Sequence, residues 1–214
     1  MNSTPLRVLI VDDHKILRRG LREVIEEDFP GAEFAEAENS QTALEQVYAS
    51  KWDLVLLDVN IPGRSGMDVL VEIKQTQPDT PVLVISAYPE EQFAIRALKL
   101  RAAGYLTKDC VADELNAAIR KALSGGRYVT SSLAERLALS MGSDIAGARH
   151  DLLSNRELQV LRLIAIGRSI KDIAGELSLS DKTVSTYRHR IAEKMGLASN
   201  VELTRYALQH QLVE

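Results

Sequence analysis

The 214-residue sequence has few of the residues that mark disulfide-rich, fibrous or disordered proteins. It contains one cysteine, 12 glycines and 6 prolines, and aromatic residues make up 5%. The lone Cys110 cannot close an internal disulfide and has no cysteine partner for a zinc site. The low glycine and proline content, with 45% hydrophobic residues, excludes collagen-like and low-complexity chains. It leaves enough apolar material for one large core or two small ones.

Long hydrophobic runs are also missing. The longest, such as VLIV at 8–11 and LVLL at 54–57, span about four residues, whereas a helix that crosses a bilayer needs about 20. The N-terminal MNSTPLRVLIVDD reaches two aspartates before the apolar core of an export signal, about 7–15 residues, can form. We therefore expect no membrane segment and a cytoplasmic location.

Short β-branched apolar runs alternate with amphipathic stretches from residue 6 to residue 124. The runs are VLIV, AEFAEAE, LVLL, PVLVIS and GYLT, and the stretches that follow them cover 14–28, 40–50, 66–77, 90–101 and 111–124. Five strand-plus-helix units in succession favour an α/β fold, because parallel strands need a crossover helix between them. The sequence predicts a doubly wound, five-stranded parallel sheet with helices on both faces.

The strand pattern ends after residue 124. The next stretch opens with two glycines, and we interpret 125–150 as a linker in which 130–141 can form a short amphipathic helix. Beyond it, four serines precede apolar-periodic segments, and three of them have a carboxylate three residues on, the arrangement of a capping box. The four are Ser154, Ser169, Ser180 and Ser199. This pattern predicts a small all-α domain of four helices at 151–214.

The charge balance changes sign at the same boundary. Residues 151–214 carry nine Lys and Arg against eight acids, a net of +1, whereas residues 1–150 carry 17 basic against 22 acidic side chains, a net of −5. Within 182–194, four basic residues stand against Glu193 alone. A basic segment in an otherwise acidic chain indicates a place where nucleic-acid phosphates bind, although a solvated helix face gives the same pattern.

Acidic residues gather where the predicted strands end. Asp12 and Asp13 follow the first strand, Asp58 follows the third, and Lys108 comes just after the fifth. These ends meet at one edge of a parallel sheet, where two carboxylates about 4 Å apart repel by roughly 4 kcal/mol at an effective dielectric of 20. A divalent cation together with Lys108 would neutralise the cluster, and oxygen ligands suit Mg²⁺. Either Asp12 or Asp13 alone could instead cap a helix or turn.

The motifs LIVDDH, LVLLDVNIPGRSGMD, VLVISAY and GYLTKD resemble, in order and spacing, the receiver domain of bacterial two-component response regulators. The resemblance covers 1–124 and implies that Asp58 accepts a phosphoryl group from a sensor histidine kinase. It implies a Mg²⁺ site made of Asp12 (through water), Asp13, Asp58 and the backbone carbonyl of Asn60. It also implies phosphate-stabilising and switch roles for Ser86, Tyr105 and Lys108. One departure is Asp109, which stands where many receivers have proline.

The segment LLSNRELQVLRLIAIGRSIKDIAGELSLSDKTVSTYRHRIAEKMGL resembles the LuxR-type helix-turn-helix domain of FixJ/NarL-class response regulators. The resemblance implies that helix 181–194 lies in the major groove of double-stranded DNA. The residues nearest the base edges would be Ser185, Thr186 and His189. Those nearer the phosphate backbone would be Lys182, Arg188, Arg190 and Lys194. The last helix, NVELTRYALQHQL, would provide a dimer contact.

These features lead to one hypothesis, a phosphorylation-activated DNA-binding transcriptional regulator that dimerises on phosphorylation. It would be no enzyme beyond, at most, loss of its own phosphoryl group. Phosphorylation would draw Ser86 and its loop inward and shift a surface formed by the fourth helix and the last two strands.

Two alternatives stay open at the level of sequence. A Mg²⁺-dependent aspartyl-phosphate phosphatase would need a second acid two residues after the nucleophile, where this chain has Asn60. A receiver could also act through protein contacts without phosphorylation. The complete set of Asp12, Asp13, Asp58 and Lys108 argues against that second alternative.

Overall fold

The computed structural model describes residues 5–110, 112–135, 149–210 and 212–213. The chain divides into two compact units, 1–137 and 138–214, each with its own core. None of the helices in the described ranges is long and apolar enough to cross a bilayer. Half of the predicted linker, residues 136–148, lies outside the described residues, as does the second half of the predicted helix 130–141.

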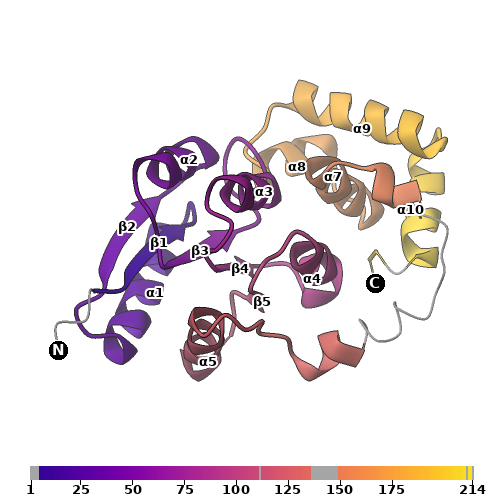
Figure 1. Cartoon of the computed structure of the whole chain (residues 1–214). Helices are drawn as coiled ribbons and strands as arrows, with labels where there is room; N and C mark the ends of the chain where they lie inside the picture. Colours follow the sequence, from indigo (N-terminus) through magenta and orange to yellow (C-terminus); the bar gives the residue numbers. More distant parts are fainter. Residues whose placement is uncertain (1–4, 111, 136–148, 211, 214) are drawn as a thin grey trace. The chain divides into compact units, whose positions relative to one another are not determined.

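The first unit alternates strands and helices close to the predicted bounds (Figure 1). Its strands are β1 (Arg7–Val11), β2 (Glu33–Ala37), β3 (Leu54–Asp58), β4 (Val82–Ser86) and β5 (Gly104–Thr107). Its labelled helices are α1 (Lys15–Asp28), α2 (Ser40–Ala49), α3 (Gly66–Thr76), α4 (Glu90–Lys99) and α5 (Ala112–Leu123). Each helix follows a strand, and α1, α2, α3 and α4 each connect two successive strands, as a parallel sheet requires.

All strand pairs are parallel and the sheet order is β2-β1-β3-β4-β5, which confirms the predicted five-stranded, doubly wound fold. The register aligns Val11 with Leu57 and Leu57 with Val84. Asp12 and Asp58 each come directly after one of these paired residues. The register therefore brings the two aspartates side by side at the carboxyl edge of the sheet.

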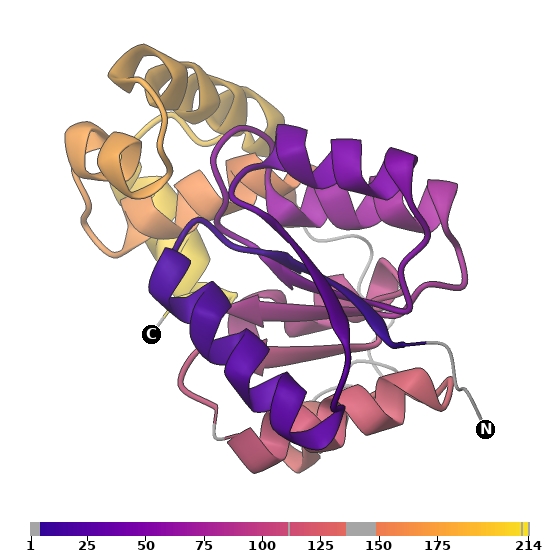
Figure 2. The same ribbon diagram turned by 90° about the vertical axis from the view of Figure 1, so that its left-hand side faces the viewer.

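Helices cover both faces of the sheet. Helices α1 and α5 lie on one face, and α2, α3 and α4 lie on the other (Figures 1 and 2). Every residue of the two strands β3 and β4 is buried, because they are covered on both sides. On the α1–α5 face, the core contains Val8, Ile10, Ile25, Leu54, Leu56, Leu83, Ile85, Leu115 and Ile119.

The chain after α5 returns to the sheet. The amide of Tyr128 donates to the carbonyl oxygen of Ala103 at 2.7 Å, and Tyr128 forms a parallel bridge with Gly104. The hydroxyl of Thr130 donates to the Glu90 carboxylate at 2.7 Å and accepts the Leu133 amide at 3.2 Å, where residues 131–135 are helical. The start of the predicted linker is therefore packed against the first unit.

The second unit is helical, as predicted. It contains a short 3₁₀ helix, η1 (Arg149–Leu152), followed by α7 (Asn155–Ala165), α8 (Ile170–Glu176), α9 (Asp181–Met195) and α10 (Asn200–Gln209). Each α-helix starts after one of the four predicted serines. Three of these starts form complete capping boxes, Ser154 with Glu157, Ser169 with Asp172, and Ser199 with Glu202. The fourth serine, Ser180, accepts the Thr183 amide at 3.1 Å.

Helices α8 and α9 pack together as a helix-turn-helix. The turn includes Ser178 in the left-handed region, with φ of 52°. Val184, Ile191 and Met195 are buried along one side of α9, which ends at Gly196, also left-handed with φ of 63°. The opposite side of α9 is left to face solvent.

Candidate functional site

Three strand ends bring Asp12, Asp58 and Lys108 together. The ammonium of Lys108 lies 2.7 Å from Oδ2 of Asp12 and 2.8 Å from Oδ2 of Asp58. Both aspartate residues are only 2% exposed. The backbone amide of Lys108 also donates to the carbonyl oxygen of Ser86 at 2.8 Å, which holds the lysine against the end of β4. The Lys108–Asp109 peptide bond is trans.

The carboxylate of Asp58 is held at both oxygens. Oδ2 accepts from Lys108, and Oδ1 accepts the backbone amide of Asn60 at 3.0 Å. Burial raises the pKa of Asp58, and Lys108 and the Asn60 amide lower it only in part. The nearby Asp12 carboxylate raises the pKa again, so Asp58 titrates above the usual range of an aspartate.

Lys108 shows the complementary effect. Burial lowers the pKa of its ammonium, but the charges and hydrogen bonds of Asp58 and Asp12 outweigh burial, and the pKa lies above its usual range. One lysine therefore faces two buried carboxylates and stays charged at neutral pH. The site keeps an excess of negative charge.

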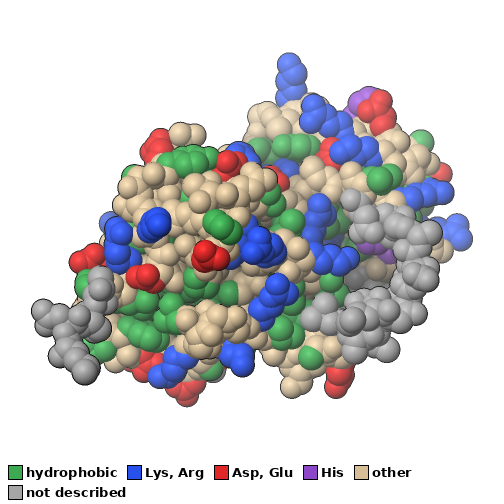
Figure 3. Space-filling view, in the orientation of Figure 1, with side chains coloured by type: hydrophobic (Ala, Val, Ile, Leu, Met, Phe, Trp, Pro, Cys, Tyr) green, Lys and Arg blue, Asp and Glu red, His purple; other side chains and the backbone are tan. Residues whose placement is uncertain are grey.

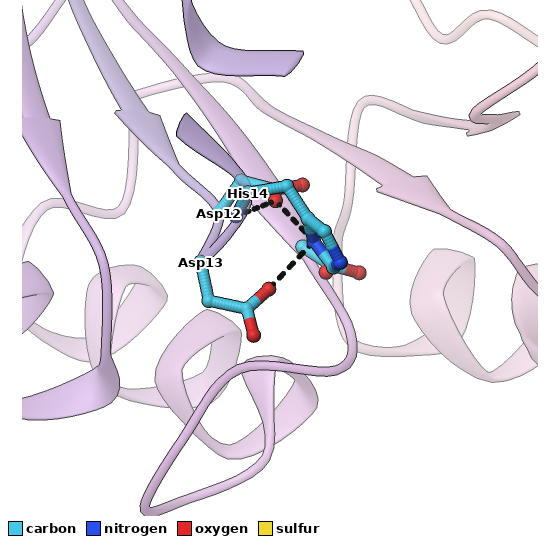
Figure 4. A group of neighbouring side chains, drawn as sticks. Asp12, Asp13 and His14 are labelled. Atoms are coloured by element: carbon cyan, nitrogen blue, oxygen red, sulfur yellow. Dashed lines mark hydrogen bonds and ion pairs between the residues drawn. The ribbon is translucent and has the colours of Figure 1, made fainter. Parts of the chain in front are cut away.

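Asp13 and His14 extend the cluster toward solvent (Figure 4). Nδ1 of His14 lies 2.8 Å from Oδ1 of Asp13 and 3.0 Å from Oδ1 of Asp12. Asp12, Asp13, His14 and Asp58 each offer one ligand atom, and these four atoms lie within 4.8 Å of one another. Three of the four residues that were predicted to hold a metal ion, Asp12, Asp13 and Asp58, thus lie together, and His14 joins them.

The donor set fits Mg²⁺. The carboxylates of Asp12, Asp13 and Asp58 are hard oxygen donors, and Lys108 balances the charge of one of them. Mg²⁺ is held in proteins by a few carboxylates together with waters and phosphate oxygens. A divalent cation here would counter both burial and the repulsion from Asp12, which raise the pKa of Asp58.

Ser86 and Tyr105 lie along the next two strands. Ser86 ends β4 fully buried, and its hydroxyl accepts the Tyr88 amide at 3.1 Å. The Tyr105 ring is buried in β5, and its hydroxyl donates to the carbonyl oxygen of Tyr88 at 2.8 Å. Both residues therefore bond to the same point of the β4–α4 loop.

In the second unit, α9 presents most of the predicted DNA-contacting residues to solvent. Lys and Arg side chains stand along this helix in Figure 3. The exposed predicted residues are Lys182, Ser185, Thr186, His189, Arg190 and Lys194. A shallow depression of about 270 Å³ lies among Lys182, Thr183, Thr186, Tyr187 and Arg190. Two cations beside one depression suit an anionic ligand.

Some of these side chains already have partners within the unit. The hydroxyls of Ser185 and Thr186 donate to backbone carbonyls one turn earlier, both at 2.9 Å. Nε of Arg188 donates to Asn200 at 2.7 Å, and Lys194 donates to Glu157 on α7 at 2.6 Å. Lys182 and Arg190 are therefore the cations that are set most clearly toward solvent.

Two residues beside the acidic cluster were not assigned to it from the sequence. His14 was interpreted as the start of the first helix, and it does occupy the N-cap position of α1, without a side-chain cap bond. Its position directly after Asp13 in the sequence is the feature that could have placed it in the cluster. Arg18 lies one helical turn further on and donates to the carbonyl oxygen of Asp12. No sequence motif marks that contact.

A parallel sheet with an acidic edge, followed by a helix-turn-helix with a basic helix, defines the class of two-unit regulators that join a receiver to a DNA-binding domain. The family models agree, since residues 8–120 match the response regulator receiver domain and residues 151–207 match the luxR family of bacterial regulatory proteins. The chain belongs to the response regulators of the FixJ/NarL class.

Curated relatives match almost the whole chain. The response regulator GacA of Pseudomonas viridiflava is 36% identical over 211 residues, which is 98% of both chains. The response regulator UvrY of Escherichia coli K12 is 34% identical over 209 residues, which is 97% of this chain and 95% of UvrY.

Solved structures show the same architecture. RcsB of Salmonella enterica serovar Typhimurium, bound to promoter rprA in the presence of the phosphomimetic BeF3−, has a TM-score of 0.62 and 26% identity over 95% of this chain and 98% of RcsB. A LuxR-family response regulator of Aurantimonas sp. SI85-9A1 has a TM-score of 0.59 and 30% identity over 65% of this chain and all of that one. The chain is thus a DNA-binding transcriptional response regulator.

Proposed function

We propose that Asp58 accepts a phosphoryl group from the phosphohistidine of a sensor histidine kinase, and that this event controls DNA binding by α9. The observation that carries the proposal is the convergence of Asp12, Asp58 and Lys108 from three strand ends, with Lys108 within 2.8 Å of both carboxylates. Buried carboxylates placed against one lysine are costly for stability alone, whereas they suit the transfer of a charged phosphoryl group.

The transfer needs no general base, because a carboxylate is already a nucleophile. An oxygen of Asp58 forms a bond to phosphorus while the bond between phosphorus and the imidazole nitrogen of the kinase breaks. The imidazole keeps that electron pair and is protonated from solvent. Lys108 would then pair with an oxygen of the transferred group, which spreads its negative charge as the bond forms.

Mg²⁺ would be held by Asp13, Asp58 and the backbone carbonyl of Asn60, with Asp12 acting through a water. When bound, Mg²⁺ supplies positive charge that favours phosphoryl transfer. The residues of this chain do the positioning, since the Asn60 amide and Lys108 each hold one oxygen of Asp58. They fix the carboxylate for in-line attack.

Ser86 and Tyr105 would couple phosphorylation of Asp58 to a change in the conformation of the surface formed by α4, β4 and β5. The Ser86 hydroxyl accepts the Tyr88 amide; once it donates to a phosphoryl oxygen instead, the β4–α4 loop is drawn toward the site. That loop carries the Tyr88 carbonyl to which the Tyr105 hydroxyl donates. Whether Tyr105 keeps this hydrogen bond would therefore depend on whether Asp58 is phosphorylated. The surface of α4, β4 and β5 then takes one of two arrangements.

DNA binding is assigned to α9. Lys182, Arg188, Arg190 and Lys194 would contact phosphates, and Ser185, Thr186 and His189 would face base edges. The solved RcsB complex with promoter rprA, formed in the presence of the phosphomimetic BeF3−, supports this assignment. The proposal includes a homodimer that forms on phosphorylation. The protein would act in the cytoplasm, with no turnover other than, at most, loss of its own phosphoryl group.

Phosphoryl transfer is tested by incubating the full-length protein with Mg²⁺ and radiolabelled acetyl phosphate. The parent should take up one phosphoryl group per chain, and Asp58→Asn should take up none. Asp53→Asn is the control, because it changes a nearby exposed aspartate whose carboxylate accepts the Arg7 amide outside the cluster. Stable label on Asp58→Asn would show that the acceptor is another residue.

A further inference from the structure

Beneath the acidic cluster lies a buried arginine on α1, Arg18, which is 7% exposed. Arginine is rarely this buried unless it is paired, and the Arg18 guanidinium pairs with the residue that follows β1 and with a residue of β2. Nη1 donates to the carbonyl oxygen of Asp12 at 2.7 Å, and Nε donates to Oε2 of Glu36 on β2 at 2.7 Å. One guanidinium thus ties α1, the end of β1 and β2 together.

The bond to Asp12 acts on the metal-binding segment itself. The carbonyl of Asp12 belongs to the same rigid peptide plane as the amide nitrogen of Asp13. On the other side, the Asp12 amide donates to the carbonyl oxygen of Ala37 on β2 at 3.0 Å. Hydrogen bonds therefore hold the backbone of Asp12 at both its amide and its carbonyl. Because Arg18 fixes the peptide between Asp12 and Asp13, it also sets the orientation of the Asp13 backbone.

Glu36 fixes the other side of the Arg18 guanidinium. Its carboxylate balances the buried guanidinium, and a charged hydrogen bond between the two is stronger and more directional than a neutral one. The planar guanidinium of arginine has several N–H donors and bonds to Glu36 and Asp12 at the same time. The single ammonium of a lysine is less suited to hold both partners. Arg18 therefore has a fixed orientation from which to hold the Asp12 carbonyl.

We infer that Arg18 is a positioning residue for the Mg²⁺ site, acting through the backbone of Asp12 and Asp13, with Glu36 as its anchor. The inference rests on the proposed role of these aspartates in holding Mg²⁺. Loss of a group that orients a metal ligand typically weakens metal binding by about 10- to 100-fold. We expect this loss for Arg18→Ala and a smaller one for Arg18→Lys and Glu36→Gln.

The test is calorimetric titration of Mg²⁺ alone into the full-length protein, at a temperature where every variant is folded by circular dichroism. Two controls on α1 separate positioning from stability. Leu21→Ala empties part of the core under α1 without touching Asp12, so it should lower the melting temperature and leave the Mg²⁺ affinity unchanged. Arg19→Ala removes an exposed arginine that pairs with Glu23 on the same helix, and should change neither property.

The outcomes are distinct. Mg²⁺ binding that weakens in Arg18→Ala, recovers partly in Arg18→Lys and is normal in Leu21→Ala supports the inference. Equal affinity for the parent and Arg18→Ala, with only the melting temperature lowered, would make Arg18 a structural residue and leave the proposed function intact. A parent protein that binds no Mg²⁺ would overturn both the inference and the proposed metal site.

Discussion

At the scale of single residues, the site depends on how closely the β3–α3 loop folds back on Asp58. A Cβ atom on Gly66 would overlap the carbonyl oxygen of Asp58, and the Gly66 amide donates to the carbonyl oxygen of Val59 at 3.0 Å. The loop can take this path only because residue 66 has no side chain.

Replacing Gly66 with alanine should therefore destabilise the first unit by about 1–3 kcal/mol or more, the usual cost of forcing an atom into packed structure. Gly20→Ala is the matched control, because a Cβ there meets no atom within 4 Å and alanine favours a helix by about 0.5–1 kcal/mol. Urea unfolding followed by fluorescence of Trp52, the only tryptophan, measures both. A Gly66→Ala protein as stable as the parent would contradict this reading of the loop.

The sequence was sufficient to predict the meeting of Asp12, Asp58 and Lys108, because parallel strands place their carboxyl ends at one edge. The partners of Arg18 and Lys194 could not be predicted. Arg18 looks like any basic residue on a surface helix, and Lys194 reaches Glu157 from 37 positions away in the chain. Such pairs depend on how helices pack, which a local pattern does not specify.

At the scale of elements, helix starts were well predicted because capping is local chemistry. The three capping boxes join residues three apart, so the sequence contains both partners. The return of the chain at Tyr128 was not predicted. It rests on a single bridge to Gly104 and one bond to Ala103, and one residue is too short to give an alternating pattern.

The capping box at the start of α7 makes the stability of the second unit depend on pH. Burial raises the pKa of Glu157, but bonds from Lys194 and Ser154 lower it more, and the pKa lies below its usual value of 4.5. A group whose folded pKa is depressed stabilises the fold above its unfolded pKa and loses this effect as the pH falls through the folded one. The second unit should therefore lose stability as the pH falls below about 4.5 and through the lower pKa that Glu157 has in the folded unit.

Glu157→Gln should make this loss shallower, because glutamine does not titrate, while it also weakens the unit at neutral pH. Glu193→Gln is the control, since Glu193 is exposed and its carboxylate lies 3.5 Å from His189 on the same helix. Urea unfolding at each pH, followed by the amide NMR signals of α7 and α9, reports the second unit alone. An equal slope with pH in the parent and Glu157→Gln would remove Glu157 as the cause.

At the scale of the whole molecule, an acidic unit is joined to one with a basic helix. This arrangement was visible in the charge balance, since residues 1–150 carry a net of −5 and residues 151–214 a net of +1. The net negative charge of residues 1–150 disfavours contact of the first unit with DNA phosphates. DNA binding should therefore depend on salt through the few cations of α9.

Lys182→Ala should weaken binding to every DNA sequence by a similar factor and reduce the slope of log K against log salt by about one. Lys51→Ala, which removes an exposed lysine from the first unit, should change neither property. Fluorescence anisotropy over a series of salt concentrations, on several unrelated duplexes, measures the slope. A loss confined to one duplex would instead place Lys182 at a base edge.

The most direct experiment asks whether phosphorylation of the first unit changes DNA binding by the second. The affinity of the full-length protein for a duplex selected from a random library is measured with and without acetyl phosphate and Mg²⁺, for the parent and for Asp58→Asn. We expect the phosphodonor to tighten DNA binding of the parent by about 5- to 150-fold, the usual range of coupling between sites, and to leave the affinity of Asp58→Asn unchanged. Equal tightening in both proteins, or none in the parent despite phosphorylation of Asp58, would contradict this expectation.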